Sequence, residues 1–72
     1  MSKTPEQLIN ILRAGGGLIL DAATRLPDQL TQIATAAAGS GATLVLRNAD
    51  YRAPDDLINI AAAGRGRVIF EL

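Results

Sequence analysis

The chain has 72 residues, enough for one small domain, and it contains neither cysteine nor histidine. No disulfide or structural zinc can therefore reinforce its small core, which leaves regular packing or association with another chain to stabilise it. Seven basic and seven acidic residues give a net charge of zero, and one Phe and one Tyr are the whole aromatic content. The composition thus lacks the basic surface and the stacking platform of a nucleic-acid-binding protein.

Three copies of one pattern, Pro-acid-(Gln or Asp)-Leu, begin at Pro5, Pro27 and Pro54. Each copy leads through an Ala/Gly stretch to a short aliphatic run, and these runs recur at spacings of 26 and 24 residues. Self-similarity at a fixed period indicates a repeat protein. We therefore expect residues 1–72 to form a single domain of three repeats, at about 4–21, 26–47 and 53–71.

The first half of each repeat predicts a helix, at 5–14, 27–38 and 54–63. Proline at the first helical position sacrifices no hydrogen bond, and acids in the first turn suit the helix dipole. Thr4 and Gln7 have the spacing of a capping box. Apolar residues recur at i, i+3 and i+4, so each helix should bury one narrow stripe.

The other two helices begin differently, because Leu26 and Ala53 precede their prolines and have no side chain that can cap. At the opposite ends, Gly15, Gly39 and Gly64 are expected to stop the three helices.

The second half of each repeat predicts a strand, at about 17–21, 43–47 and 67–71. Strands joined through helices by short connections require a parallel sheet with right-handed crossovers. The predicted fold class is α/β: three helix–strand repeats that form a parallel three-stranded sheet with all helices on one face, in a solenoid-like arrangement.

This unit of 24–26 residues with a Leu-x-Leu strand resembles the leucine-rich-repeat class, most closely in the segment 44–49, Leu-Val-Leu-Arg-Asn-Ala. Asn48 matches that family's asparagine, whereas the same position in the other repeats holds Ala22 and Leu72. The resemblance implies a solenoid with a binding or assembly surface and no particular ligand.

Alternate residues of a strand face opposite sides of its sheet. With the Leu-x-Leu side chains turned to the helices, the other face carries three rows across the strands. These rows are Gly17/Thr43/Arg67, then Ile19/Val45/Ile69, then Asp21/Arg47/Glu71.

Two interpretations of this face stay open. It is either an ordinary exposed face with salt bridges along the row of alternating charge, or a surface whose Ile19, Val45 and Ile69 are buried in an assembly. The second is favoured, since parallel sheets are normally covered on both faces and this chain has no second layer of helices. The strands at the two edges can also pair with another copy, which would place Glu71 beside Asp21.

The sequence gives little support for catalysis or for the binding of a phosphate, cofactor or metal. The Gly-rich segments at 15–17, 39–41 and 64–67 follow helices and precede strands, whereas a phosphate-binding loop has the reverse order. No base–nucleophile pair is apparent, so we expect no enzyme and no cofactor or metal. The edge where the parallel strands end is the place for a small ligand, or else an ordinary solvated loop region. It holds Asp21, Thr24, Arg25, Arg47, Asn48, Asp50, Tyr51 and Arg52.

The sequence therefore favours a structural, self-assembling protein that forms homo-oligomers or filaments through its sheet face and its open ends. The alternative is a protein-binding module, such as an immunity protein, antitoxin or adaptor, that uses the same face on another protein. No targeting signal or membrane span is evident, which makes the cytoplasm the default location, with export that needs no cleavable signal left open.

Overall fold

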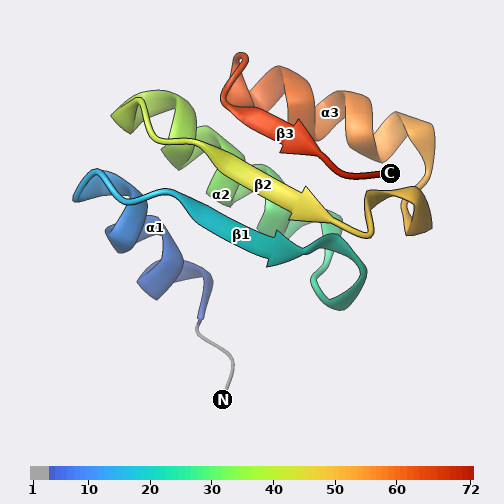
Figure 1. Cartoon of the computed structure of the whole chain (residues 1–72), viewed down its shortest axis with the longest axis horizontal. Helices are drawn as coiled ribbons and strands as arrows, with labels where there is room; N and C mark the ends of the chain where they lie inside the picture. Colours follow the sequence, from blue (N-terminus) through green and yellow to red (C-terminus); the bar gives the residue numbers. More distant parts are fainter. Residues whose placement is uncertain (1–3) are drawn as a thin grey trace.

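The computed structural model describes residues 4–72, and it alternates helices with strands as the sequence predicts (Figure 1). The three strands form one parallel sheet in the order β1-β2-β3. All three helices lie behind this sheet in Figure 1, and each strand–helix–strand crossover is right-handed. The predicted α/β class and sheet order are confirmed. The elements are α1 (Pro5–Arg13), β1 (Leu18–Asp21), α2 (Pro27–Ser40), β2 (Leu44–Arg47), α3 (Pro54–Gly64) and β3 (Val68–Phe70).

The helix starts follow local chemistry. In α1 the Gln7 amide donates to Thr4 Oγ1 at 3.2 Å, and the Thr4 amide donates to Gln7 Oε1 at 3.0 Å, so the predicted capping box is formed. Leu26 and Ala53 make no side-chain cap for α2 and α3, as expected. Those two helices begin at proline with aspartate in the first turn, which the dipole favours.

The predicted helix stops are correct only for α1, where Gly15 follows the helix with a φ of 99°. Gly39 lies inside α2, which continues to Ser40 and ends with Gly41 in the left-handed region. Gly64 is the last residue of α3, and Arg65 takes the left-handed position that follows it, with a φ of 50°. The prediction for Gly39 was therefore wrong, because Gly41 takes the left-handed position after α2. At Gly64 the helix does end, but close packing against Val68 and not turn geometry requires the glycine.

The hydrophobic core lies between the sheet and the helices, and β2 and α2 are at its centre. The side chains that point from β2 to the helices, Leu44 and Leu46, are fully buried, as are Leu30 and Ile33 of α2. At Gly64 an added Cβ would overlap a methyl group of Val68, so the absence of a side chain there lets α3 approach β3 closely. The small residues of the later helical turns thus bring the two layers together.

Two short 3₁₀ helices, η1 (Ala22–Thr24) and η2 (Ala49–Tyr51), follow β1 and β2 directly. The repeat did not predict them. They turn the chain at the carboxyl edge of the sheet, and each buries one alanine, Ala22 or Ala49, against the core.

Candidate functional site: the open face of the sheet

The face of the sheet that is turned away from the helices carries an apolar row in its middle. Ile19, Val45 and Ile69 are aligned on the three strands by the parallel register. The side chains at the two edges are exposed, Ile19 by 67% and Ile69 by 54%, whereas Val45 between them is half-buried. Three β-branched side chains in contact across neighbouring strands make a small continuous apolar surface in place of scattered apolar residues.

A second row lies toward the amino ends of the strands, where Gly17, Thr43 and Arg67 are all exposed. A Cβ at Gly17 would lie 3.2 Å from the Thr43 carbonyl oxygen, so the backbones approach closely there. Arg67 is therefore the one long side chain of this row, and it lies on β3's side of the face.

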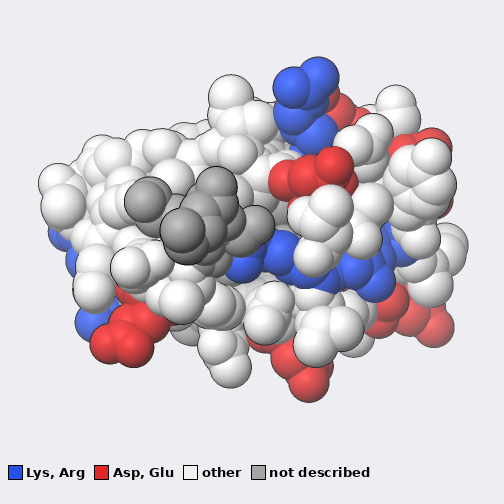
Figure 2. Space-filling model, turned by 90° about the horizontal axis from the view of Figure 1, so that it is seen from below, with Lys and Arg blue, Asp and Glu red and all other residues white. Residues whose placement is uncertain are grey.

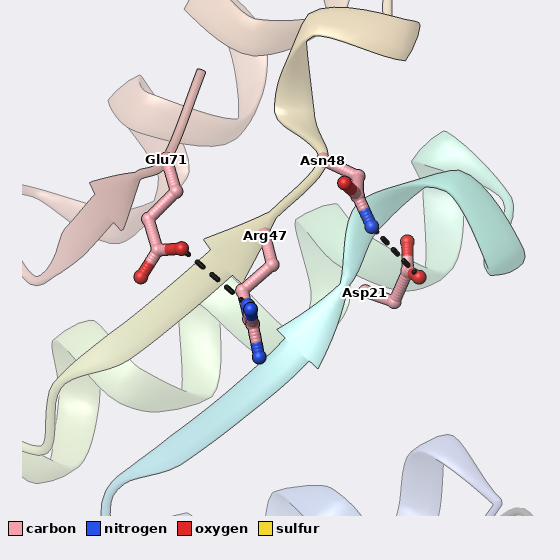
Figure 3. A network of polar contacts seen from close by, with 4 residues as sticks. All are labelled: Asp21, Arg47, Asn48 and Glu71. Carbon is pink, nitrogen blue, oxygen red and sulfur yellow. Dashed lines mark hydrogen bonds and ion pairs between the residues drawn. The ribbon is translucent and has the colours of Figure 1, made fainter.

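The third row lies where the strands end, and its charges pair in a way that corrects the sequence prediction (Figure 3). Arg47 Nε lies 3.4 Å from Glu71 Oε1, and both side chains are largely exposed. Asp21 does not complete the expected alternating row with Arg47. Its Oδ2 accepts a hydrogen bond of 3.0 Å from Asn48 Nδ2, and its Oδ1 accepts one of 2.8 Å from the Ala23 amide.

Local geometry explains why Asp21 pairs with an amide. Asn48 adopts the left-handed conformation, with a φ of 57°, which asparagine tolerates better than most residues. Its side chain is thereby turned toward β1, while Asp21 acts as the N-cap of η1. Sequence reasoning named both residues but missed this bond, and the only available signal was an asparagine at a strand end.

The remaining polar residues at this edge hold the loops together. The Arg52 Nε donates to the Ala22 carbonyl at 2.8 Å, and its guanidinium also donates to the Arg25 carbonyl. Thr24 Oγ1 donates to the Asp21 carbonyl at 3.1 Å. Arg52 thus connects the loop after β2 with the loop after β1, whereas Thr24 forms its bond within the loop after β1.

Asp50 and Tyr51 lie in η2 and are exposed, Tyr51 by 76%. A shallow hollow beside the charged row is lined by Ile19, Leu20, Asp21, Arg47 and Asn48. Within residues 4–72, no three carboxylates come together in a way that could hold a metal ion. The open face thus offers an apolar row, a neutral ion pair and an amide–carboxylate pair, which suits contact with a protein surface.

Across the described part of the chain, none of the helices has the length and apolar character to span a bilayer. Comparisons of the chain with known protein families, with curated proteins and with solved structures found no match. The resemblance to leucine-rich repeats therefore stays a prediction that rests on the period and on the segment around Asn48.

Proposed function

We propose that the chain is a structural, self-assembling module and that a second copy covers the open face of its sheet. The observation that carries this proposal is the exposed row of Ile19, Val45 and Ile69 on a parallel sheet whose helices all lie on the other side. Parallel sheets are almost always covered on both faces. A second copy is a suitable cover, because its own row is apolar and of the same size.

The free energy gained by burying the apolar row against a second copy is modest. Fully burying three aliphatic side chains contributes about 5–9 kcal/mol per copy, and Val45 is already half-buried, which places the gain near the lower end of that range. Three strands spaced at about 4.8 Å, with five residues at about 3.3 Å each, give roughly 230 Å² of flat surface. Stable interfaces bury roughly 800 Å² per partner, so this face alone should form a weak contact.

The orientation of the two copies follows from the charges. If the strands of the two copies run antiparallel across the interface, the row of Asp21, Arg47 and Glu71 lies over the row of Gly17, Thr43 and Arg67 of the other copy. Glu71 then faces Arg67, which is an attraction made twice in a two-fold dimer. If the strands run parallel instead, Glu71 faces Asp21 and Arg47 faces itself, and both contacts are repulsive.

Val45→Glu tests the proposal, because it places a carboxylate at the centre of the contact, where an unpaired charge is costly. We expect the wild-type mass, measured by sedimentation velocity over a wide concentration range, to rise with concentration, and the variant's mass to rise much less. Gln32→Glu is the control, since it adds the same charge to an exposed position of α2, on the opposite side of the sheet from the apolar row. Circular dichroism checks that both variants remain folded.

An unchanged mass for Val45→Glu would show that the face is not the contact. A wild-type chain that stays monomeric at all concentrations would contradict self-assembly, and would favour the second function predicted from the sequence, a module whose open face covers a different protein.

A further inference from the structure

The three helices carry the same two side stripes, one toward the preceding repeat and one toward the following repeat. Ile9, Thr31 and Ile58 occupy the same repeat position, counted from the proline that begins each helix. Ile9 and Thr31 are half-buried, whereas Ile58 is 64% exposed. This position is therefore covered in the first two repeats and uncovered in the third.

The position three residues further along the helix behaves in the same way. Leu12 of α1 and Ala34 of α2 are 0% exposed, but Ala61 of α3 is exposed. An added Cβ at Gly64 of α3 would lie 3.6 Å from the Cβ of Ala34, which shows that this stripe of α2 touches α3 directly. The stripe that faces the following repeat is thus buried wherever a following repeat is present.

The opposite stripe shows the reverse order of burial. Ile33 of α2 and Ile60 of α3 are 0% exposed, whereas Ile11, at the same position of α1, is 37% exposed. Gly15 is likewise exposed, with open space where its Cβ would be, although Gly64 at the matching position is buried. The stripe that faces the preceding repeat is therefore buried in the second and third repeats and uncovered in the first.

We propose that these two uncovered stripes bind each other head to tail, so that the α3 side of one copy docks on the α1 side of a second copy. This inference rests on the proposed self-assembly and names its second contact. The occupant is another copy of this chain because Ile11 and Gly15 stand at the positions that α2 and α3 already use against their predecessors. The contact would repeat an interface that the fold contains twice.

The sheet allows the same docking. The order β1-β2-β3 leaves β1 and β3 as the edge strands of residues 4–72, and β3 of one copy can pair with β1 of the next as β2 pairs with β3. The register would bring Glu71 beside the next copy's Asp21. This repulsion is small, because Glu71 is paired with Arg47 and Asp21 accepts two hydrogen bonds within its own chain.

The α1 side is suited to an apolar contact. Figure 2 looks onto this side of the molecule, and apart from the atoms drawn in grey its left half is mostly uncharged, with the charged groups at the margins and in a band farther right. On the α3 side, the uncovered stripe includes Ile58 and Ala61 and has Arg65 as its only charged member. Because the two surfaces differ, the contact is heterologous and generates open chains of copies, or rings if the rotation closes.

The test places a charge on each stripe in turn and measures self-association by sedimentation velocity. Ile58→Glu should weaken it by on the order of tenfold to a hundredfold, because the carboxylate would be buried against the next copy. Asn59→Glu is a matched control one residue away, at a helix position that is exposed in all three repeats. Ile11→Glu, with Asn10→Glu as its control, should have the same effect from the other side.

A mixture of the two variants gives the sharpest readout. In chains that also carry Val45→Glu, which removes the sheet-face contact, an Ile11→Glu chain keeps an intact α3 side and an Ile58→Glu chain keeps an intact α1 side. Their mixture should therefore form a species of two chains that neither variant forms alone. Circular dichroism and thermal unfolding of each variant verify that the fold is retained. If the mixture forms no two-chain species, or if Ile58→Glu weakens self-association no more than Asn59→Glu does, the head-to-tail contact is wrong.

This result is separable from that of the sheet face, because all chains can also be made with Val45→Glu. If Val45→Glu removes association and the helix variants leave it unchanged, the face contact stands and the head-to-tail contact fails. If the helix variants weaken self-association and Val45→Glu does not, the head-to-tail contact stands and the face contact fails. A wild-type chain that never associates overturns both.

Discussion

The two faces of the same three strands are both apolar at their centres but have very different surroundings. On the helix side, Leu44 and Leu46 are completely buried. On the other side, Ile19 and Ile69 are more than half exposed. A half-buried strand usually alternates apolar and polar residues, whereas these strands are apolar on both faces at their centres. The difference shows that the single chain covers only one of the two apolar faces, and this is the observation from which we propose a second contact.

The largest expected effect is a difference in the free energy of unfolding between substitutions on the two faces of the sheet. Leu46→Ala should lower the free energy of unfolding by about 2–5 kcal/mol, since it leaves a cavity beneath the helices. Ile19→Ala removes a similar volume from the open face and should cost about 1 kcal/mol or less. Urea unfolding at low protein concentration measures both without a contribution from assembly. Equal losses would mean that the two faces are equally buried in the single chain.

A smaller effect tests how closely the helices lie on the covered face. Gly64→Ala should destabilise the chain by about 1–3 kcal/mol, because its methyl group would overlap the side chain of Val68. Gly39→Ala is the matched control, as it lies within α2, has no atom within 4 Å of the added Cβ and should stabilise by about 0.4–1 kcal/mol. Thermal unfolding of the two variants should shift in opposite directions. A shift in the same direction would show that Gly64 has no packing role.

The contrast between these glycines also shows where sequence reasoning succeeds. The repeat predicts the order of elements, the strand register and the separation of the two faces, because the same residue pattern occurs three times in the chain. The capping box at Thr4 was equally predictable, since it depends on residues close in the chain. Gly39 and Gly64 each follow three alanines in the sequence, and only the fold shows that Gly64 lies against Val68 whereas Gly39 has open space where its Cβ would be.

The three residue rows of the candidate site could be predicted from the sequence, but the hydrogen bonds of its side chains could not. Ile19, Val45 and Ile69 follow from the two-residue period of a strand. The partner of Asp21 does not follow from it, because the choice between Arg47 and Asn48 depends on the left-handed backbone at Asn48. Likewise, Arg52 reaches carbonyl groups 27 and 30 residues earlier in the chain, a contact that no local pattern specifies.

The smallest effect concerns Glu71 in the charged row of the open face. Within one chain Glu71 attracts Arg47, whereas between head-to-tail copies it would repel Asp21 of the next copy. Glu71→Gln removes the ion pair with Arg47, which is exposed and contributes about 0–1 kcal/mol, so the single chain should be at most slightly less stable. If β3 pairs with β1 of the next copy, the same change removes the repulsion between Glu71 and Asp21. Head-to-tail association should then strengthen by a few tenths to about 1 kcal/mol.

Salt should act in the same direction as Glu71→Gln, because salt screens the two carboxylates. In chains that carry Val45→Glu, which removes the sheet-face contact, head-to-tail association should therefore increase in salt, and it should increase less when Glu71→Gln is also present, as measured by sedimentation velocity. Asp28→Asn is the control, since it removes an exposed carboxylate from α2, the helix between the two docking sides. An assembly whose size is indifferent to salt and to Glu71→Gln would contradict this strand register, and would leave the apolar faces as the contact to pursue.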